Sequence, residues 1–217
     1  MGIAAAVFDF DLTLADSTAG AVECSNHALR RLGLPAADAA AIRRTIGLPL
    51  PRAFCALTGA EDPARGEAFA ACFIERADEV MVDLTALFPD VPEMLARLQD
   101  SGVRAAIVST KFRRRIECIL AREKLRDAFA AIVGGEDVAR LKPDPEGLRR
   151  ALGALGVPGA RAVYVGDHPI DAEAASRAGM RFVAVLTGAS GAEDFAGFEV
   201  ARVLPSLAPL PTALAGL

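Results

Sequence analysis

Short apolar segments alternate with amphipathic segments along most of this sequence, and the alternation limits the folds that the chain can adopt. The apolar runs have the length of buried strands and read IAAAVF, VRAAIVS, AAIV, RAVYVG and RFVAVL. Between most of them lie stretches with helical apolar spacing and glycine near their ends, such as DVPEMLARLQDSG, FRRRIECILARE, PEGLRRALGALG and IDAEAASRAG. Strands that alternate with helices predict an α/β fold with a doubly wound, parallel, Rossmann-like sheet.

The segment from residue 17 to residue 85 departs from this alternation. It shows no good strand pattern, only helical patterns at TAGAVECSNHALRRLG, DAAAIRRTIG, RAFCALTG and ARGEAFAACFIERADEVM. Such a block after the first strand predicts an all-helical insertion that leaves and re-enters the sheet through two linkers. We therefore expect a core domain formed by residues 1–16 and 86–217 and a helical domain formed by residues 17–85.

Composition narrows the range of partners and compartments. The 217 residues carry a formal net charge of -4 with no basic block, so we expect no nucleic acid and no membrane as a partner, and a small ligand instead. The N-terminus lacks the basic region of a signal peptide, and no apolar stretch reaches the ~18 residues of a membrane span. The four cysteines form no C-x-x-C pair and are interpreted as reduced core residues. We expect a cytoplasmic protein.

Polar side chains stand where the predicted strands end. The stretch FDFDLTLAD places Asp9 and Asp11 after the first strand, Ser109 ends VRAAIVS, and Asp167 follows RAVYVG. Ligands of parallel sheets bind at the carboxyl ends of the strands. A period of two puts Asp9 and Asp11 on one side of an extended chain, where their like charges repel. A divalent cation removes that penalty, and Mg²⁺ prefers oxygen ligands of this kind, which Asp167 can complete.

A metal site with two neighbouring carboxylates suits phosphoryl transfer. Asp9 can attack phosphorus as a nucleophile when a cation allows the anionic group to approach. Asp11 can protonate the leaving oxygen and then deprotonate the hydrolytic water.

At this point the sequence resembles a known family, the haloacid dehalogenase-like hydrolases. The stretch FDFDLTLADS is similar to the D-x-D-x-T-L signature of their phosphatases, and three later motifs follow in order. Ser109 in IVSTK resembles the second motif, Lys142 in RLKPDPE the third, and Asp167 with Asp171 in VGDHPIDAEAASRAG the fourth. The helical insertion resembles the small cap of the phosphoglycolate phosphatase-like subgroup.

The resemblance implies a role for each motif residue. Asp9 is expected to be the nucleophile and Asp11 the general acid and base, and Lys142 is expected to neutralise the nucleophile and the phosphoryl group. The Mg²⁺ ion is expected to be held by Asp9, the backbone carbonyl of Asp11 and Asp167. Asp171 is expected to orient the metal's waters and Lys142. The residues expected on the substrate side are Thr13, Ser109, Thr110 and Lys111.

Two positions depart from the family pattern. Leu12 stands where the family usually has glycine, and Thr110 where asparagine is common. The chemistry survives both changes, because neither residue carries a catalytic group.

The cap is expected to determine which substrate enters. The stretch RRTIGLPLPR resembles the cap segment with a central glycine found in phosphoglycolate phosphatases, and Gly47 permits a close backbone approach. Contacts of Arg43, Arg44, Arg52 or His168 with the substrate stay open, since exposed helix charges and loop residues of this kind are common. The basic stretch from Lys111 to Arg115 fits either an anion-steering patch or, apart from Lys111, a solvated helix face.

These observations predict a Mg²⁺-dependent phosphatase that hydrolyses a small phosphorylated metabolite through an aspartyl-phosphate at Asp9, with phosphoglycolate as one candidate substrate. A sugar-phosphate mutase of the β-phosphoglucomutase type shares all four motifs and is the main alternative. A non-catalytic binding protein on the same fold is disfavoured, since no catalytic position is missing. The sequence leaves open whether the protein is a monomer or a homodimer.

Overall fold

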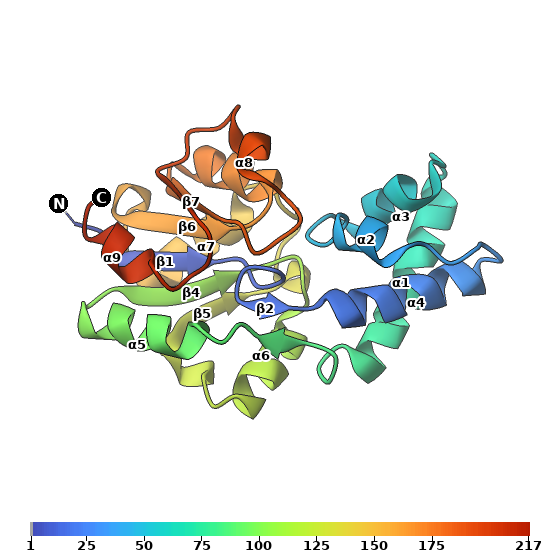
Figure 1. Cartoon of the computed structure of the whole chain (residues 1–217), viewed down its shortest axis with the longest axis horizontal. Helices are drawn as coiled ribbons and strands as arrows, with labels where there is room; N and C mark the ends of the chain where they lie inside the picture. The colour runs from blue at the N-terminus through green and yellow to red at the C-terminus, as the bar shows by residue number, and fades with distance from the viewer. Residues whose placement is uncertain (1) are drawn as a thin grey trace.

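A six-stranded parallel sheet forms the centre of the molecule in a computed structural model that describes residues 2–217 (Figure 1). The strand order is β5-β4-β1-β6-β7-β8, so the first strand lies in the middle. The strands are β1 (Ala5–Phe8), β4 (Arg104–Val108), β5 (Phe129–Val133), β6 (Ala162–Gly166), β7 (Arg181–Val185) and β8 (Arg202–Leu204). The order reverses direction at β1, and in such sheets ligands bind beside this switch point.

Helices cover both faces of the sheet, because the strand side chains alternate between two apolar layers. Ala6 and Phe8 point into the layer formed with α5 (Val91–Asp100), α6 (Arg113–Arg122) and α9 (Leu210–Leu214). Ala5 and Val7 point into the opposite layer, formed with α7 (Glu146–Leu155) and α8 (Pro169–Ala178). A sheet buried on both faces explains why its strands are continuous apolar runs. The predicted α/β fold with a doubly wound parallel sheet is confirmed.

The segment after the first strand is helical, as expected. It contains α1 (Thr18–Arg31), α2 (Ala39–Arg43), α3 (Leu50–Thr58) and α4 (Pro63–Val80), which lie together on one side of the sheet domain (Figure 1). A small apolar core centred on Leu29, Phe54 and Phe69 holds these helices together. The division of the chain into two domains at the predicted boundaries stays a prediction.

The two chain crossings between sheet and insertion pair with each other. The strand β2 (Ala15–Asp16) leaves the sheet domain and β3 (Ala86–Leu87) returns to it, and the two form an antiparallel ribbon. This ribbon was not expected from the sequence, because two residues are too few to show an alternating pattern.

The C-terminal elements were not predicted from the sequence, and the cysteines differ from expectation. The strand β8 and the helix α9 have three and five residues, too short for a visible period, yet Leu207, Leu210 and Leu214 of this region are buried in the core. Of the four cysteines only Cys24 is buried, so the interpretation of all four as core residues is wrong. In residues 2–217, no helix has both the length and the apolarity needed to cross a membrane.

Arginines tie the insertion to the sheet domain on two sides. The buried guanidinium of Arg115 on α6 donates to the Asp78 carboxylate (2.8 Å from Nε) and to the carbonyl of Ile74 (3.0 Å), both on α4. Arg43 on α2 donates to the carbonyl of Thr187 in the loop after β7 (2.8 Å). The expectation of a solvated helix face therefore fails for Arg115, which anchors the insertion.

We expect Arg115→Ala to lower the free energy of unfolding by about 1–3 kcal/mol, because it removes the hydrogen bonds that a buried guanidinium donates to the Asp78 carboxylate and the Ile74 carbonyl. Arg114 pairs with the same carboxylate, but its side chain is 57% exposed. Arg114→Ala is the matched control and should cost less than about 1 kcal/mol. Urea denaturation of the two variants measures the difference, and equal losses would contradict the anchoring role.

Candidate active site

Three buried aspartates meet at the carboxyl end of the sheet. Asp9 follows β1, Asp167 follows β6, and Asp171 lies in the first turn of α8. Each offers a carboxylate oxygen that lies within 4.8 Å of those of the other two. The central strands position two of them, because β1 and β6 are hydrogen-bonded neighbours with Phe8 opposite Val165. The predicted meeting of Asp9 with Asp167 is what the geometry shows.

A buried lysine neutralises part of this acidic group. The ammonium of Lys142 lies 3.0 Å from Asp9 Oδ2 and donates to Asp171 Oδ1 at 2.6 Å. It also donates to the hydroxyl of Tyr164 on β6 (3.1 Å). A buried ammonium needs carboxylate partners, and buried carboxylates need a cation, so Lys142, Asp9 and Asp171 stabilise one another. Lys142 therefore lies where the sequence predicts it, between the expected nucleophile and Asp171.

The surroundings shift the pKa values of Asp9, Asp167 and Lys142. Burial, opposed by the neighbouring Lys142 charge and reinforced by Asp171 and Asp11, raises the pKa of Asp9 to about 6. Burial and then the charges of Asp171 and Asp9 raise the pKa of Asp167 well above its usual range. Burial alone would lower the pKa of Lys142, but the carboxylates of Asp171 and Asp9 raise it above its ordinary value. Lys142 stays charged, while Asp9 and Asp167 resist ionisation without a further cation.

One carboxylate oxygen of Asp9 has no donor. Asp9 Oδ1 is buried and accepts no hydrogen bond from residues 2–217, although Oδ2 contacts Lys142. A buried acceptor without a donor is costly unless a ligand satisfies it. The Asp9 oxygen without a donor and the raised pKa of Asp167 both fit a divalent cation that Asp9 and Asp167 would hold. Asp171 fits a supporting role, since its oxygens already accept from Lys142 and the backbone N–H of His168.

The side chain of Asp11 does not join this cluster. The backbone turns after Phe10, whose carbonyl accepts from the N–H groups of Leu14 and Ala15. Asp11 Oδ1 instead accepts from the ammonium of Lys111 at 2.8 Å. Asp9 thus pairs with Lys142, whereas Asp11 pairs with Lys111. Coordination by the backbone carbonyl of Asp11 stays a prediction.

Leu12 holds the turn in an unusual conformation. Its φ of 60° lies in the left-handed region, where leucine is disfavoured and where the family's glycine is comfortable. The side chain of Leu12 is buried, and its carbonyl accepts a hydrogen bond from the Thr187 hydroxyl at 2.6 Å. Packing and this bond offset the backbone strain, which explains how leucine replaces glycine here.

The remaining motif residues lie around the same end of the sheet. The Thr13 hydroxyl donates to Asp167 Oδ1 at 2.8 Å, so Thr13 positions an expected metal ligand. Ser109 follows β4, the other neighbour of β1, and its hydroxyl accepts from the N–H of Lys111. Thr110 and Lys111 line a cavity that also contacts the insertion.

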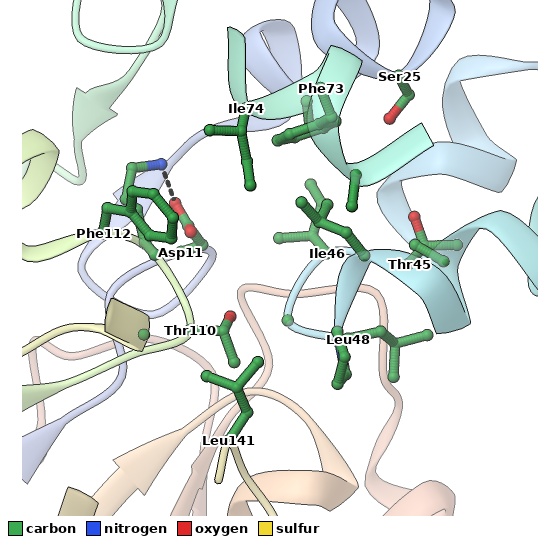
Figure 2. Close-up of a pocket in the computed structure, with 18 of the residues that line it drawn as sticks. Asp11, Ser25, Thr45, Ile46, Leu48, Phe73, Ile74, Thr110, Phe112 and Leu141 are labelled. Carbon is green, nitrogen blue, oxygen red and sulfur yellow. Dashed lines mark hydrogen bonds and ion pairs between the residues drawn. The ribbon is translucent and has the colours of Figure 1, made fainter. Parts of the chain in front are cut away.

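That cavity has a volume of about 420 Å³ and lies between the insertion and the sheet domain (Figure 2). Asp11 and Thr110 lie at its sheet end, and Gly47 contributes to the insertion side, as predicted for a cap residue. Gly47 has a φ of +95°, so its backbone conformation requires glycine. Arg43, Arg44 and Arg52 do not line the cavity.

Some functional contacts escaped sequence reasoning. Tyr164 is the chain's single tyrosine and sits in an apolar strand, where its pattern indicates only core packing. Its hydroxyl nevertheless donates toward the Val108 carbonyl and accepts from Lys142. Thr187 lies in a loop with no motif at all. His168, left open as a substrate contact, accepts from the N–H of Ile170 and caps α8.

Comparison with known proteins identifies the family. The sequence pattern of the haloacid dehalogenase-like hydrolases matches residues 6–185 of this chain. The chain belongs to this family. The match spans β1 to β7 and so includes every motif that the resemblance rested on.

Individual relatives agree with this haloacid dehalogenase-like assignment. A phosphoglycolate phosphatase of Cupriavidus necator is 33% identical over 213 residues, which cover 97% of this chain and 92% of the relative. A phosphoglycolate phosphatase of Rhodobacter capsulatus is 33% identical over 187 residues, covering 85% and 84% of the two chains. A solved haloacid dehalogenase-like hydrolase of Bacteroides fragilis has a TM-score of 0.92 at 39% identity and covers 96% of this chain and 99% of its own.

The cluster of aspartates gives a prediction for the pH dependence of metal binding. The raised pKa of Asp9 means that its neutral form stabilises the fold below pH 3.8, and that this stability is lost as the pH rises through about 6. A divalent cation held by the ionised carboxylates would offset this loss, so added Mg²⁺ should raise the melting temperature more near pH ~7.5 than near pH ~5.

Differential scanning fluorimetry with and without Mg²⁺ at the two pH values measures this effect. Asp167→Asn should remove most of the Mg²⁺ effect, whereas Asp11→Asn should keep it, because the Asp11 side chain lies outside the cluster. A Mg²⁺ effect that does not change with pH, or that survives in Asp167→Asn, would place the metal elsewhere.

Proposed function

We propose that this hydrolase is a Mg²⁺-dependent phosphatase that cleaves a small phosphomonoester through an aspartyl-phosphate on Asp9. The observation that carries the proposal is the separation of the two aspartates. Asp9 lies in the buried cluster beside Lys142, while Asp11 lines the cavity in which a leaving group can sit. Relatives named phosphoglycolate phosphatase support a small phosphorylated substrate.

The residues divide the reaction between them. Asp9 attacks phosphorus, forming its bond to the phosphoryl group as the bond to the leaving oxygen breaks. Asp11 donates a proton to that oxygen, then takes a proton from the water that hydrolyses the aspartyl-phosphate. Lys142 balances charge on Asp9 and the phosphoryl oxygens, which Ser109 also binds. Asp9 and Asp167 would hold the Mg²⁺ ion, which would supply charge neutralisation for the approach of the anionic group.

The nucleophile is tested by Asp9→Asn. An amide cannot form the acyl phosphate, so turnover of p-nitrophenyl phosphate should fall to background and no hydroxylamine-sensitive phosphoenzyme should form. Rapid quenching with radiolabelled substrate measures the phosphoenzyme, and circular dichroism confirms that the variant is folded. Normal phosphorylation of Asp9→Asn would falsify the assignment.

The acid role is tested by Asp11→Asn with two leaving groups. Loss of a general acid typically costs about 10²- to 10⁴-fold for an alkoxide, which needs a proton to leave. The loss should be much smaller for p-nitrophenolate, which leaves without one. First-turnover release of each alcohol isolates this step from the later hydrolysis, and equal losses would argue against the acid role.

The same assays separate the alternatives. A phosphatase releases inorganic phosphate in a Mg²⁺-dependent reaction. A β-phosphoglucomutase-like enzyme would interconvert sugar monophosphates when primed with a bisphosphate, and a non-catalytic binding protein would do neither. Product analysis by ³¹P NMR distinguishes the three outcomes.

A further inference from the structure

The cavity between the insertion and the sheet domain has mostly apolar walls. Figure 2 shows Ile46, Leu48, Phe73, Ile74, Phe112 and Leu141 around it, contributed by both parts of the molecule. Its volume of about 420 Å³ lies within the range of roughly 300–1,000 Å³ of pockets that bind drug-sized ligands. The space is therefore larger than a two-carbon acid needs, and its surface favours apolar contacts.

The charged groups of the cavity wall are already paired or acidic. Lys111 binds Asp11, and Arg115 binds Asp78 and the Ile74 carbonyl. Glu67 also lines the cavity and forms no ion pair within residues 2–217. In the described part of the chain, no unpaired cation reaches this wall, and hydroxyl groups such as those of Ser25 and Thr110 supply polarity without charge.

The three arginines that could bind an acidic group of the substrate do not line the cavity. Arg43 donates to the Thr18 hydroxyl (2.6 Å) and the Thr187 carbonyl (2.8 Å) and lies 3.7 Å from Asp16. Arg44 and Arg52 are exposed and do not line the cavity. A carboxylate or a second phosphate on the substrate would lose its hydration here, meet the Glu67 charge and gain no free cation.

We propose that the leaving group of the natural substrate is a neutral, largely apolar alcohol, aliphatic or aromatic, that fills this cavity. The inference rests on the proposed phosphatase function and specifies its substrate class. Asp11 lies at the sheet end of the cavity, so an ester bound with its organic part against Ile46 and Phe73 has its bridging oxygen on the side of the expected acid. The same charge arrangement disfavours phosphoglycolate and sugar bisphosphates.

The test is a series of substrates with equal leaving-group chemistry. Ethyl, butyl and hexyl phosphate expel alcohols of nearly equal basicity, so differences in kcat/KM report binding of the chain. Burial of each added methylene should raise kcat/KM by up to about fourfold. Hexyl phosphate should exceed both ethyl phosphate and phosphoglycolate by at least about tenfold. A flat series, or a preference for phosphoglycolate, would overturn the inference.

A pair of variants on α4 locates the effect. Ala70 lines the cavity, whereas its neighbour Ala71 is exposed on the same helix. Ala70→Leu shortens the cavity and should lower the ratio of kcat/KM for hexyl over ethyl phosphate by about fourfold or more. Ala71→Leu makes the same change of volume outside the cavity and should leave the ratio unchanged. Equal ratios in both variants would contradict binding of the chain in this cavity.

These results distinguish a failure of the apolar substrate class from a failure of the phosphatase function. If p-nitrophenyl phosphate is hydrolysed but the alkyl series is flat, the phosphatase proposal stands and the apolar substrate class is wrong. If no phosphomonoester is hydrolysed with Mg²⁺ present, the proposed function fails and the substrate inference fails with it.

Discussion

The buried ammonium of Lys142 is the interaction on which the rest of the site depends. It lies 3.0 Å from Asp9 Oδ2 and 2.6 Å from Asp171 Oδ1, and it also donates to the Tyr164 hydroxyl. Without it, three aspartates would have to share one desolvated region with no compensating charge. The lysine comes from the loop before α7, while Asp9 and Asp167 follow β1 and β6 and Asp171 lies on α8, so this ion cluster also holds separate elements together. Fold and chemistry thus rest on the same few contacts.

A second lysine, Lys111, gives Asp11 surroundings that differ from those of Asp9. Lys111 binds Asp11, and this places the expected acid on the wall of the cavity while Asp9 stays in the buried cluster. The two aspartates are two residues apart in the chain but face different environments, one ionic and dry, the other beside apolar space. Such a difference in surroundings lets identical side chains perform different tasks. It also means that charge recognition is concentrated at the phosphoryl end, leaving the far end of the cavity to apolar contacts.

Sequence reasoning reached the parts of the structure that leave a local signal. The five long strands show continuous apolar runs because both faces of the sheet are buried, and the helices show a 3.6-residue period. Asp9, Lys142 and Asp167 were identifiable because each stands in a motif at a strand end or loop. The contacts of Tyr164, Thr187 and Arg115 depend on residues 22 to 175 positions away, so no local pattern predicts them. The turn after Phe10 also escaped, since an extended strand was assumed up to Asp11.

The ribbon of β2 and β3 has a consequence for how such a molecule can vary. Ala15 lies opposite Leu87 and Asp16 opposite Ala86, so the outgoing and returning chains are held at the spacing of neighbouring strands, about 4.8 Å. Everything between them is inserted at what amounts to a single point. The pairing of β1 with β4 continues the sheet across this insertion and involves no residue between β2 and β3. A change in the length or shape of the helical part therefore leaves the path of the sheet unchanged as long as its two ends meet at this spacing, although the contacts of Arg43 and Arg115 with the other part would have to be rebuilt.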